Sequence, residues 1–246
     1  MLSKVLITGG NREAYLSVPN TTVVATARDP SKCESLTALP AAAGSRLIIV
    51  KMEMASSESI VSGIETLKTT HGFRTLDIVI ANAGISGPTP SLAQAAVSEI
   101  QKYIDVNAYG SLNLFKATLP LLRSASVDGT KAKFVLVSSA GGSLTNMYDF
   151  MPLAAYGASK ALANFFTKWL SLEHKDLIVW AHNPGPIDTD MTRGSQDLAE
   201  SLGLDLSSMV FTPPEEVASV MKKVIDGATE SISGKFIDRD GTEMAW

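Results

Sequence analysis

Tyr156 and Lys160 are four residues apart, so a helical segment would place both side chains on one face. A free phenol has a pKa near ~10 and is a reluctant acid or base at neutral pH. A neighbouring ammonium favours the phenolate, so Lys160 is expected to lower the pKa of Tyr156. Ser139 follows a short apolar run, and its hydroxyl can hydrogen-bond a substrate carbonyl. These groups suit proton transfer to the alkoxide that hydride transfer to a ketone leaves, although the tyrosine–lysine pair alone could equally be surface packing.

The elements that must position these residues are short apolar strands alternating with helices. Continuous β-branched runs are typical of strands buried on both faces; they cover residues 5–8, 22–26, 47–50, 78–80, 134–137, 177–179 and 235–237. Helix-like stretches lie between them, at residues 58–70, 99–122, 154–172 and 214–225. This alternation predicts an α/β fold: a single, doubly wound Rossmann-type domain over residues 1–246, with about seven parallel strands flanked by helices.

Composition excludes several classes of function. The 246 residues are 45% hydrophobic and 19% charged, with a net charge of −4, which argues against a nucleic-acid or membrane-surface protein. The one cysteine, Cys33, cannot form an internal disulfide, and no Cys/His cluster suggests a metal. The apolar run at residues 5–7 is too short for a signal peptide, and none approaches the ~20 residues of a membrane helix. We therefore expect a cytoplasmic protein.

Small and polar residues follow nearly every predicted strand, where ligands bind in open parallel sheets. The sequences there, together with Asn107, resemble the short-chain dehydrogenase/reductase family over almost the whole chain. The residues that carry this resemblance are 81–84 (Ala-Asn-Ala-Gly), Asn107, Ser139, 156–160 (Tyr-Gly-Ala-Ser-Lys) and 183–189 (Asn-Pro-Gly-Pro-Ile-Asp-Thr). Residues 28–30, the long loop before Tyr156 and residues 241–246 look like fungal ketoreductases of the norsolorinic-acid ketoreductase type.

The resemblance implies four catalytic residues: Ser139, Tyr156, Lys160 and Asn107. In the family, the backbone at the position of Asn107 holds a water that links the lysine to solvent, although a mid-helix asparagine can also be an ordinary polar residue. Many relatives place the serine 13 residues before the tyrosine, which here is Ser143. We prefer Ser139, 17 residues before Tyr156, because it directly follows the predicted strand.

The resemblance also implies a nicotinamide dinucleotide site. Its residues in this chain are Gly9, Arg12, Arg28, Glu53, Met54, Asn82, Ala83, Gly84, Tyr156, Lys160, Pro184, Gly185, Ile187 and Thr189. Arg28 follows the second strand, where a 2′-phosphate would lie, and Arg12 could join it, so NADP(H) is expected rather than NAD. The alternative is that Arg28 is simply an exposed arginine at the end of a strand.

The glycine-rich cofactor motif is incomplete. The family motif reads T-G-x-x-x-G-x-G, whereas this chain has Thr8-Gly-Gly-Asn-Arg12 and then Glu13, without the second and third glycines. About seven residues, or roughly two helical turns, are missing from the family layout. The crossover can still close, but its helix must be short and dinucleotide affinity should fall sharply. Three explanations remain open: a gene-model or splice deletion, a natural loss that abolishes redox activity, or a reshaped loop that still binds cofactor.

Apolar, flexible side chains around the expected site indicate a bulky apolar or polycyclic ketone. They are Met147, Phe150, Met151 and Met191. The alternative is that Met147, Phe150 and Met151 cap the core. Apolar stripes on the helices at residues 99–122 and 154–172 indicate a homodimer or homotetramer, as in the family, unless core burial alone explains them.

We therefore expect an NADPH-dependent ketoreductase of the kind found in secondary metabolism, with Tyr156 as the proton donor. The incomplete glycine motif supports an alternative: a reductase scaffold that has lost its cofactor and acts as a non-redox enzyme or as a binding module.

Overall fold

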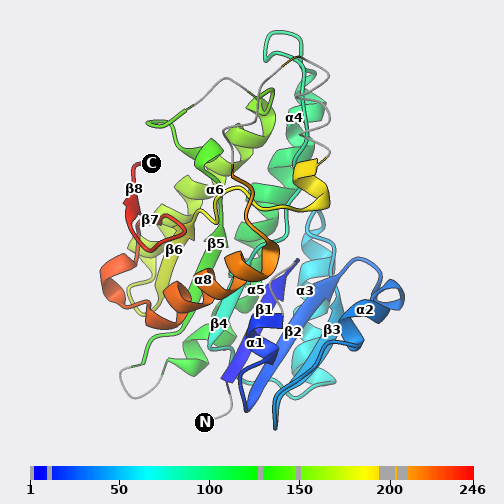
Figure 1. The fold of residues 1–246 in the computed structure, drawn as a ribbon. Helices are drawn as coiled ribbons and strands as arrows, with labels where there is room; N and C mark the ends of the chain where they lie inside the picture. The colour runs from blue at the N-terminus through cyan, green and yellow to red at the C-terminus, as the bar shows by residue number, and fades with distance from the viewer. Residues whose placement is uncertain (1–2, 10–12, 127–129, 148–150, 194–202, 204–209) are drawn as a thin grey trace.

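An eight-stranded sheet forms the centre of the computed structural model, which describes residues 3–9, 13–126, 130–147, 151–193, 203 and 210–246. The strand order is β3-β2-β1-β4-β5-β6-β7-β8, parallel except for β8 (Figure 1). The strands are β1 (Ser3–Thr8), β2 (Thr21–Ala27), β3 (Arg46–Lys51), β4 (Ile78–Ala81), β5 (Lys133–Val137), β6 (Ile178–His182), β7 (Phe236–Ile237) and β8 (Glu243–Met244). The order changes direction between β1 and β4, which creates the crevice where α/β sheets bind ligands.

The expected Rossmann-type fold is confirmed, and all seven predicted strands are present. The eighth strand, β8, was not predicted. It pairs antiparallel with β7 through a turn closed by a hydrogen bond from the Asp238 amide to the Thr242 carbonyl at 2.8 Å. A two-residue edge strand has neither an apolar run nor a period that the sequence could reveal.

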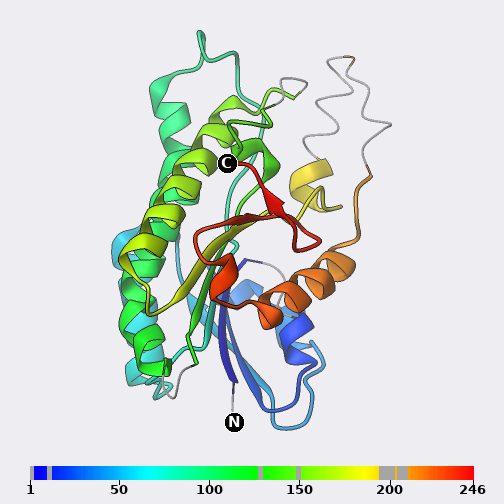
Figure 2. The same cartoon turned by 90° about the vertical axis from the view of Figure 1, so that its left-hand side faces the viewer.

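Helices cover both faces of the sheet (Figure 2). One face packs against α3 (Ser57–Thr69), α5 (Gly110–Ala125) and α6 (Ala154–Glu173), and the other against α1 (Glu13–Leu16) and α8 (Pro214–Gly227). Alternate strand residues are buried in these two cores, Leu6 in the first and Ile7 in the second. The continuous apolar runs therefore reflect strands covered on both sides.

The helix over residues 97–125 contains a wider turn. It consists of α4 (Val97–Tyr103), a π-helical segment η2 (Ile104–Tyr109) and α5. Two short elements follow β2, η1 (Pro30–Lys32) and α2 (Glu34–Thr37), while η3 (Ala140–Gly142) follows β5 and η4 (Glu230–Ile232) precedes β7. Among the described residues, no helix is long and apolar enough to cross a membrane.

The first crossover helix is shortened, as the sequence predicts. Residues 9–20 make the whole connection from β1 to β2, and α1 has only four residues. Tyr15 holds α1 against α8: its ring is buried, its hydroxyl donates to Asp226 at 3.4 Å, and Lys222 Nζ lies 5.2 Å from the ring centroid. The C-terminal half of α1, next to the start of β2, is therefore anchored to α8.

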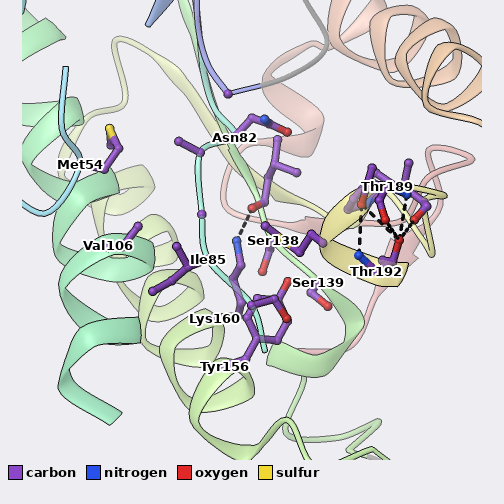
Figure 3. Close-up of a pocket in the computed structure, with 18 of the residues that line it drawn as sticks. Met54, Asn82, Ile85, Val106, Ser138, Ser139, Tyr156, Lys160, Thr189 and Thr192 are labelled. Atoms are coloured by element: carbon purple, nitrogen blue, oxygen red, sulfur yellow. Dashed lines mark hydrogen bonds between the residues drawn. The ribbon is translucent and has the colours of Figure 1, made fainter. Parts of the chain in front are cut away.

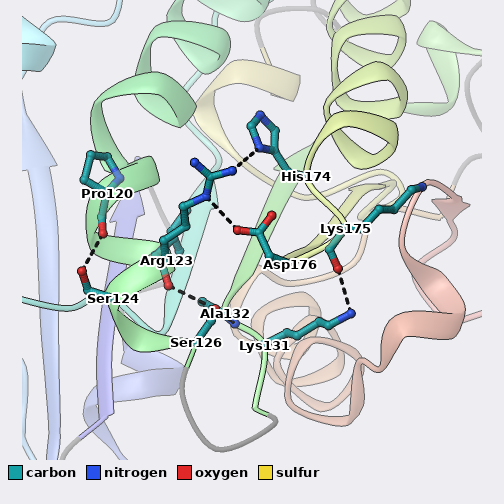
Figure 4. Close-up of polar contacts among 10 residues, drawn as sticks. Pro120, Arg123, Ser124, Ser126, Lys131, Ala132, His174, Lys175 and Asp176 are labelled. Carbon is teal, nitrogen blue, oxygen red and sulfur yellow. Dashed lines mark hydrogen bonds and ion pairs between the residues drawn. The ribbon is translucent and has the colours of Figure 1, made fainter.

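A polar cluster joins the helices at the amino ends of β5 and β6, opposite the carboxyl ends (Figure 4). Arg123 Nε of α5 donates to Asp176 Oδ2 at 2.7 Å, and Arg123 also contacts His174 Nδ1 at 3.2 Å. Lys131 Nζ donates to the Lys175 carbonyl at 2.8 Å. These half-exposed contacts tie α5 to the segment that leaves α6.

Candidate functional site

A cavity of about 760 Å³ opens at the carboxyl ends of the strands (Figure 3). Residues that follow β1, β2, β3, β4, β5 and β6 line it, together with the first turns of α6. This is where the topology predicts a ligand, because the carboxyl ends of parallel strands meet at one edge of the sheet.

Ser139 is placed at the cavity by the turn that follows β5. It caps η3 with an extended backbone, and its Oγ accepts a hydrogen bond from the Gly141 amide at 3.1 Å. That bond occupies a lone pair and leaves the hydroxyl proton free to donate. Ser139 lines the cavity, so it can donate to a carbonyl oxygen bound there.

Tyr156 and Lys160 project from the start of α6, and Figure 3 shows them beside Ser139. Lys160 Nζ lies 5.7 Å from the centroid of the Tyr156 ring and donates to the Val137 carbonyl at 2.8 Å. The Lys160 side chain is only 5% exposed, and this burial lowers its pKa to about 8. The ammonium has three donors, and Val137 takes one of them.

A glycine makes room for this lysine. A Cβ on Gly142 would lie 2.8 Å from Lys160 Cβ, whereas one on Gly84 would meet Asn107 Oδ1 at 2.9 Å. The turn after β5 therefore approaches the lysine more closely than a larger residue would allow. Lys160 is held in a fixed position against the cavity.

Asn107 lies beside the cavity without lining it. Its Oδ1 accepts from the Ile85 amide at 2.8 Å, and its Nδ2 donates to the Ile85 carbonyl and to Ser159 Oγ, both at 2.9 Å. The side chain is thus a brace between the loop after β4 and α6, placed by the π-helical turn. The predicted role of its backbone in a water relay remains a prediction.

Ser143, the alternative serine, is fully buried and does not line the cavity. Its Oγ donates to the Ala245 carbonyl at 2.9 Å and accepts from the Asn146 amide at 3.0 Å. This geometry places Ser139, and not Ser143, beside Tyr156.

The residues expected to hold a dinucleotide surround the cavity, except Arg12, which lies outside the described residues. Those that line it are Gly9, Arg28, Glu53, Met54, Asn82, Ala83, Gly84, Tyr156, Lys160, Pro184, Gly185, Ile187 and Thr189. Gly9 has a φ of +78°, and a Cβ there would lie 2.5 Å from Asn82 Nδ2. The turn after β1 therefore requires glycine both for its conformation and for its contact with the turn after β4.

Arg28 and Asp29 follow β2 with different surroundings. Arg28 is exposed at the cavity, and no ion pair is formed by its guanidinium within the part of the chain that the structure describes. The Asp29 carboxylate accepts from Ser31, at 3.1 Å from its amide and 2.6 Å from its hydroxyl, and these bonds lower its pKa. The arginine is thus available to an anion, while the carboxylate is already engaged.

The predicted substrate residues divide into three groups. Met151 and Met191 line the cavity, whereas Phe150 lies outside the described residues. Met147 is 68% exposed and is not among the described residues that line the cavity, so its contact with substrate stays a prediction. It belongs to a loop without periodicity, where the sequence cannot show which way a side chain points.

Several residues at the cavity were not singled out from the sequence. Ile85, Leu153 and Phe211 line the cavity from loops that were expected near the site, but no motif distinguishes them from their neighbours. Asn183 joins three segments: its Oδ1 accepts from the amides of Ala140 at 3.0 Å and Gly185 at 3.3 Å, and its Nδ2 donates to Asp238 at 2.8 Å. The position of Asn183 at the start of the Asn-Pro-Gly motif is the feature of the sequence from which this positioning role could have been predicted.

Comparison with known proteins gives one family. A family model described as short chain dehydrogenase matches residues 5–199. The chain is 64% identical to the short chain dehydrogenase gsfK of Penicillium aethiopicum, with both chains fully covered. That alignment spans 253 positions against 246 residues here, so at least seven positions have no counterpart in this chain. The chain is also 33% identical to the norsolorinic acid ketoreductase nor1 of Dothistroma septosporum, covering 98% of this chain and 91% of the relative.

Solved structures show the same fold. The NADPH-bound carbonyl reductase from chicken fatty liver superposes with a TM-score of 0.82 at 27% identity, covering 100% of this chain and 99% of that one. The carbonyl reductase Sniffer of D. melanogaster has a TM-score of 0.83 at 24% identity, with both chains fully covered.

Proposed function

The chain belongs to the short chain dehydrogenase family, and we propose that it is an NADPH-dependent ketoreductase for a bulky apolar or polycyclic ketone. Members of this family are oxidoreductases that act on C=O and CH–OH groups. The observation that carries the proposal is the placement of Ser139, Tyr156 and Lys160 around one cavity that also reaches Arg28.

Each of these three side chains has its own role at the carbonyl oxygen. The nicotinamide, when bound, supplies a hydride to the carbonyl carbon. Ser139 donates its hydroxyl proton as a hydrogen bond to the oxygen, since Gly141 already fixes the serine oxygen. Tyr156 gives its phenolic proton to the same oxygen as negative charge develops there. The Lys160 ammonium, buried and 5.7 Å from the ring centroid, stabilises the phenolate that remains.

The described residues fit an NADP dinucleotide at both ends of the cavity. Lys160 has two donors beyond the one that Val137 takes, which suits the hydroxyls of a ribose. Arg28 suits a 2′-phosphate better than the engaged Asp29 suits a free 2′-hydroxyl. Support for the pyrophosphate, between these two ends, is expected to be weak, because α1 has four residues and Glu13 places a negative charge in its first turn. We therefore expect NADPH to bind, with weaker support for its pyrophosphate than a complete glycine motif gives.

The lining of the cavity supports a neutral, apolar substrate. Its charged residues, among those described, are Arg28, Glu53 and Lys160, all assigned to the cofactor. The remaining wall includes Met151, Leu153, Ile85, Met191 and Phe211. Methionine and aromatic side chains adapt to large planar ligands. Relatives named norsolorinic acid ketoreductases agree with this substrate class.

The deciding experiment titrates the purified protein with NADPH, using NADH as a control, and then supplies norsolorinic acid or α-tetralone. NADPH binding in the micromolar range and loss of ketone reduction in Tyr156→Phe, with unchanged cofactor binding, are the expected results. Unchanged reduction in Tyr156→Phe would remove the tyrosine from the mechanism. Absence of NADPH binding up to millimolar concentration would favour a scaffold that has lost its cofactor.

We further propose that the enzyme forms homodimers or homotetramers through an aromatic face on η2 and α6. Phe165 and Trp169 are 60% and 52% exposed and stack with centroids 6.0 Å apart, while Leu172 is 51% exposed on the same helix. Tyr109 stacks on Phe166 at 6.2 Å beside them. Adjacent exposed aromatic residues are typical of surfaces that are covered by another chain.

A further inference from the structure

Residues 245–246, the tail, are hydrogen-bonded to residues 143–146, the docked loop, and the proposed chemistry uses neither segment. Ser143 Oγ donates to the Ala245 carbonyl at 2.9 Å. The amide and the hydroxyl of Thr145 both donate to the Trp246 carbonyl, at 3.0 and 2.8 Å. Three hydrogen bonds thus join segments that are about a hundred residues apart in the sequence.

The tail is itself fixed to the core. It follows β8, which pairs with β7, and the Trp246 ring stacks on Phe236 at 5.5 Å between centroids and 24° between planes. Phe236 is fully buried, and Nζ of Lys168, a residue of α6, lies 5.7 Å from the centroid of the Trp246 ring. The docked loop is therefore bonded to a rigid support.

The docked loop is part of the connection that builds the substrate side of the cavity. It begins one residue after η3, whose N-cap is Ser139 and whose Gly142 carbonyl accepts from Asn164 Nδ2 at 3.2 Å. Met151 and Leu153, which line the cavity, come from the same connection between β5 and α6. The structure places Ser143, Thr145 and the tail outside the cavity lining, so none of them is a contact of a ligand bound there.

We propose that the tail positions this connection for the ketone, so that residues 245–246 set ketone affinity without contacting the ketone. The inference rests on the proposed function and deepens it. Residues 143–146, held by these hydrogen bonds, lose little conformational entropy when substrate binds, whereas a released loop must be ordered at the expense of affinity. Most of the proposed cofactor contacts come from other segments, at the ends of β1, β2, β3, β4 and β6, so we expect cofactor binding not to respond.

Two variants and two controls test the proposed clamp, by which we mean the three hydrogen bonds that join residues 143–146 to residues 245–246. Truncation after Met244 removes the tail, and Thr145→Val removes one of its hydrogen bonds at constant shape. We expect truncation to raise the KM for the ketone about tenfold, with kcat within about twofold and the NADPH Kd unchanged, and Thr145→Val to show a smaller change in KM alone. Thr69→Val removes a comparable hydroxyl bond within α3, and Trp246→Phe keeps the tail carbonyl and an aromatic ring. Both should retain the wild-type KM.

Hydrogen exchange tests the same proposal without turnover. The amides of Thr145 and Asn146 should exchange at least about tenfold faster in the truncated protein, with the strands of the sheet unchanged. Unchanged exchange and KM would overturn the clamp, and faster exchange throughout the sheet would show that the tail only stabilises the fold. If the wild-type protein reduces neither norsolorinic acid nor α-tetralone, the proposed function fails, whereas exchange at residues 145–146 still decides whether the tail holds the loop.

Discussion

Lys160 is a charged side chain inside the protein, and its titration should be visible in the activity. Burial lowers its pKa to about 8, so the ammonium that we propose to stabilise the phenolate is lost as the pH rises through that value. We expect kcat/KM for ketone reduction to fall about tenfold per pH unit above pH ~8, since this ratio reports the free enzyme. Initial rates from pH 6 to 10 measure it. Lys160→Met should have a residual rate without this decline, and a wild-type profile that stays flat to pH 9.5 would contradict the assignment.

His182 makes a separate prediction about stability. It is fully buried on β6, and among the described residues neither ring nitrogen has a hydrogen-bond partner. Burial lowers the pKa of His182 to about 4, against the opposing effect of the Asp238 charge. An unfolded chain takes up this proton near pH ~6.5 and the folded one only near pH 4, so stability falls as the pH drops below about 6.5.

The expected loss from His182 is about 2 kcal/mol in the free energy of unfolding between pH 7.5 and pH 5. Urea unfolding at the two pH values measures it in the wild type. Other groups titrate in the same range, so His182→Gln, which stays neutral, provides the reference. The pH dependence should be smaller in His182→Gln by this amount, and equal pH dependence in both proteins would show that His182 is accessible to protons in the folded state.

At the scale of elements, we expect the short α1 to limit cofactor binding. The helix has four residues, whereas the family motif provides two more glycines and about two further turns before it. Inserting a seven-residue segment after Arg12 that completes T-G-x-x-x-G-x-G should lower the NADPH Kd about tenfold or more, because it adds backbone amides and a longer helix beside the pyrophosphate. Isothermal calorimetry measures the change.

The same insertion with valine in place of both glycines is the matched control, because it restores length without close backbone approach. Its NADPH Kd should stay near the wild-type value. Equal tightening by both insertions would assign the effect to crossover length alone, and no tightening by either would mean that the shortened turn already supports the phosphates fully.

How far the sequence predicts each element depends on how local its signal is. The strands and the stub of α1 follow from continuous apolar runs and from counting residues between β1 and β2. The hydrogen bonds of Ser143 and Thr145 to the tail join positions more than a hundred residues apart, and no pattern links them. The exposed Met147 shows the same limit for side chains in aperiodic loops. The proposed catalytic set could be named from the sequence because its residues have fixed places at strand ends and on α6.

At the scale of the whole molecule, the proposed active site and the proposed subunit contact lie on different parts of the fold. The cavity opens at the carboxyl ends of the strands, while the aromatic face lies on the outside of α6, the helix that also carries Tyr156 and Lys160. Phe165 and Trp169 follow Lys160 by five and nine residues. Because one helix carries both, subunit contacts at this face would stabilise the element that holds the catalytic pair.

Disrupting this face should therefore separate the subunits. Phe165→Arg combined with Trp169→Glu places charges on the stacked pair, and we expect the particle mass in light scattering to fall to that of one 26.1 kDa chain. Val61→Arg changes a similarly exposed apolar residue on α3 and should leave the mass unchanged. A wild-type protein that is already monomeric at micromolar concentration would contradict the assembly. A Tm comparison then tests whether this contact stabilises α6. The wild-type Tm should rise with protein concentration, whereas the Tm of the monomeric double variant should be lower and independent of concentration.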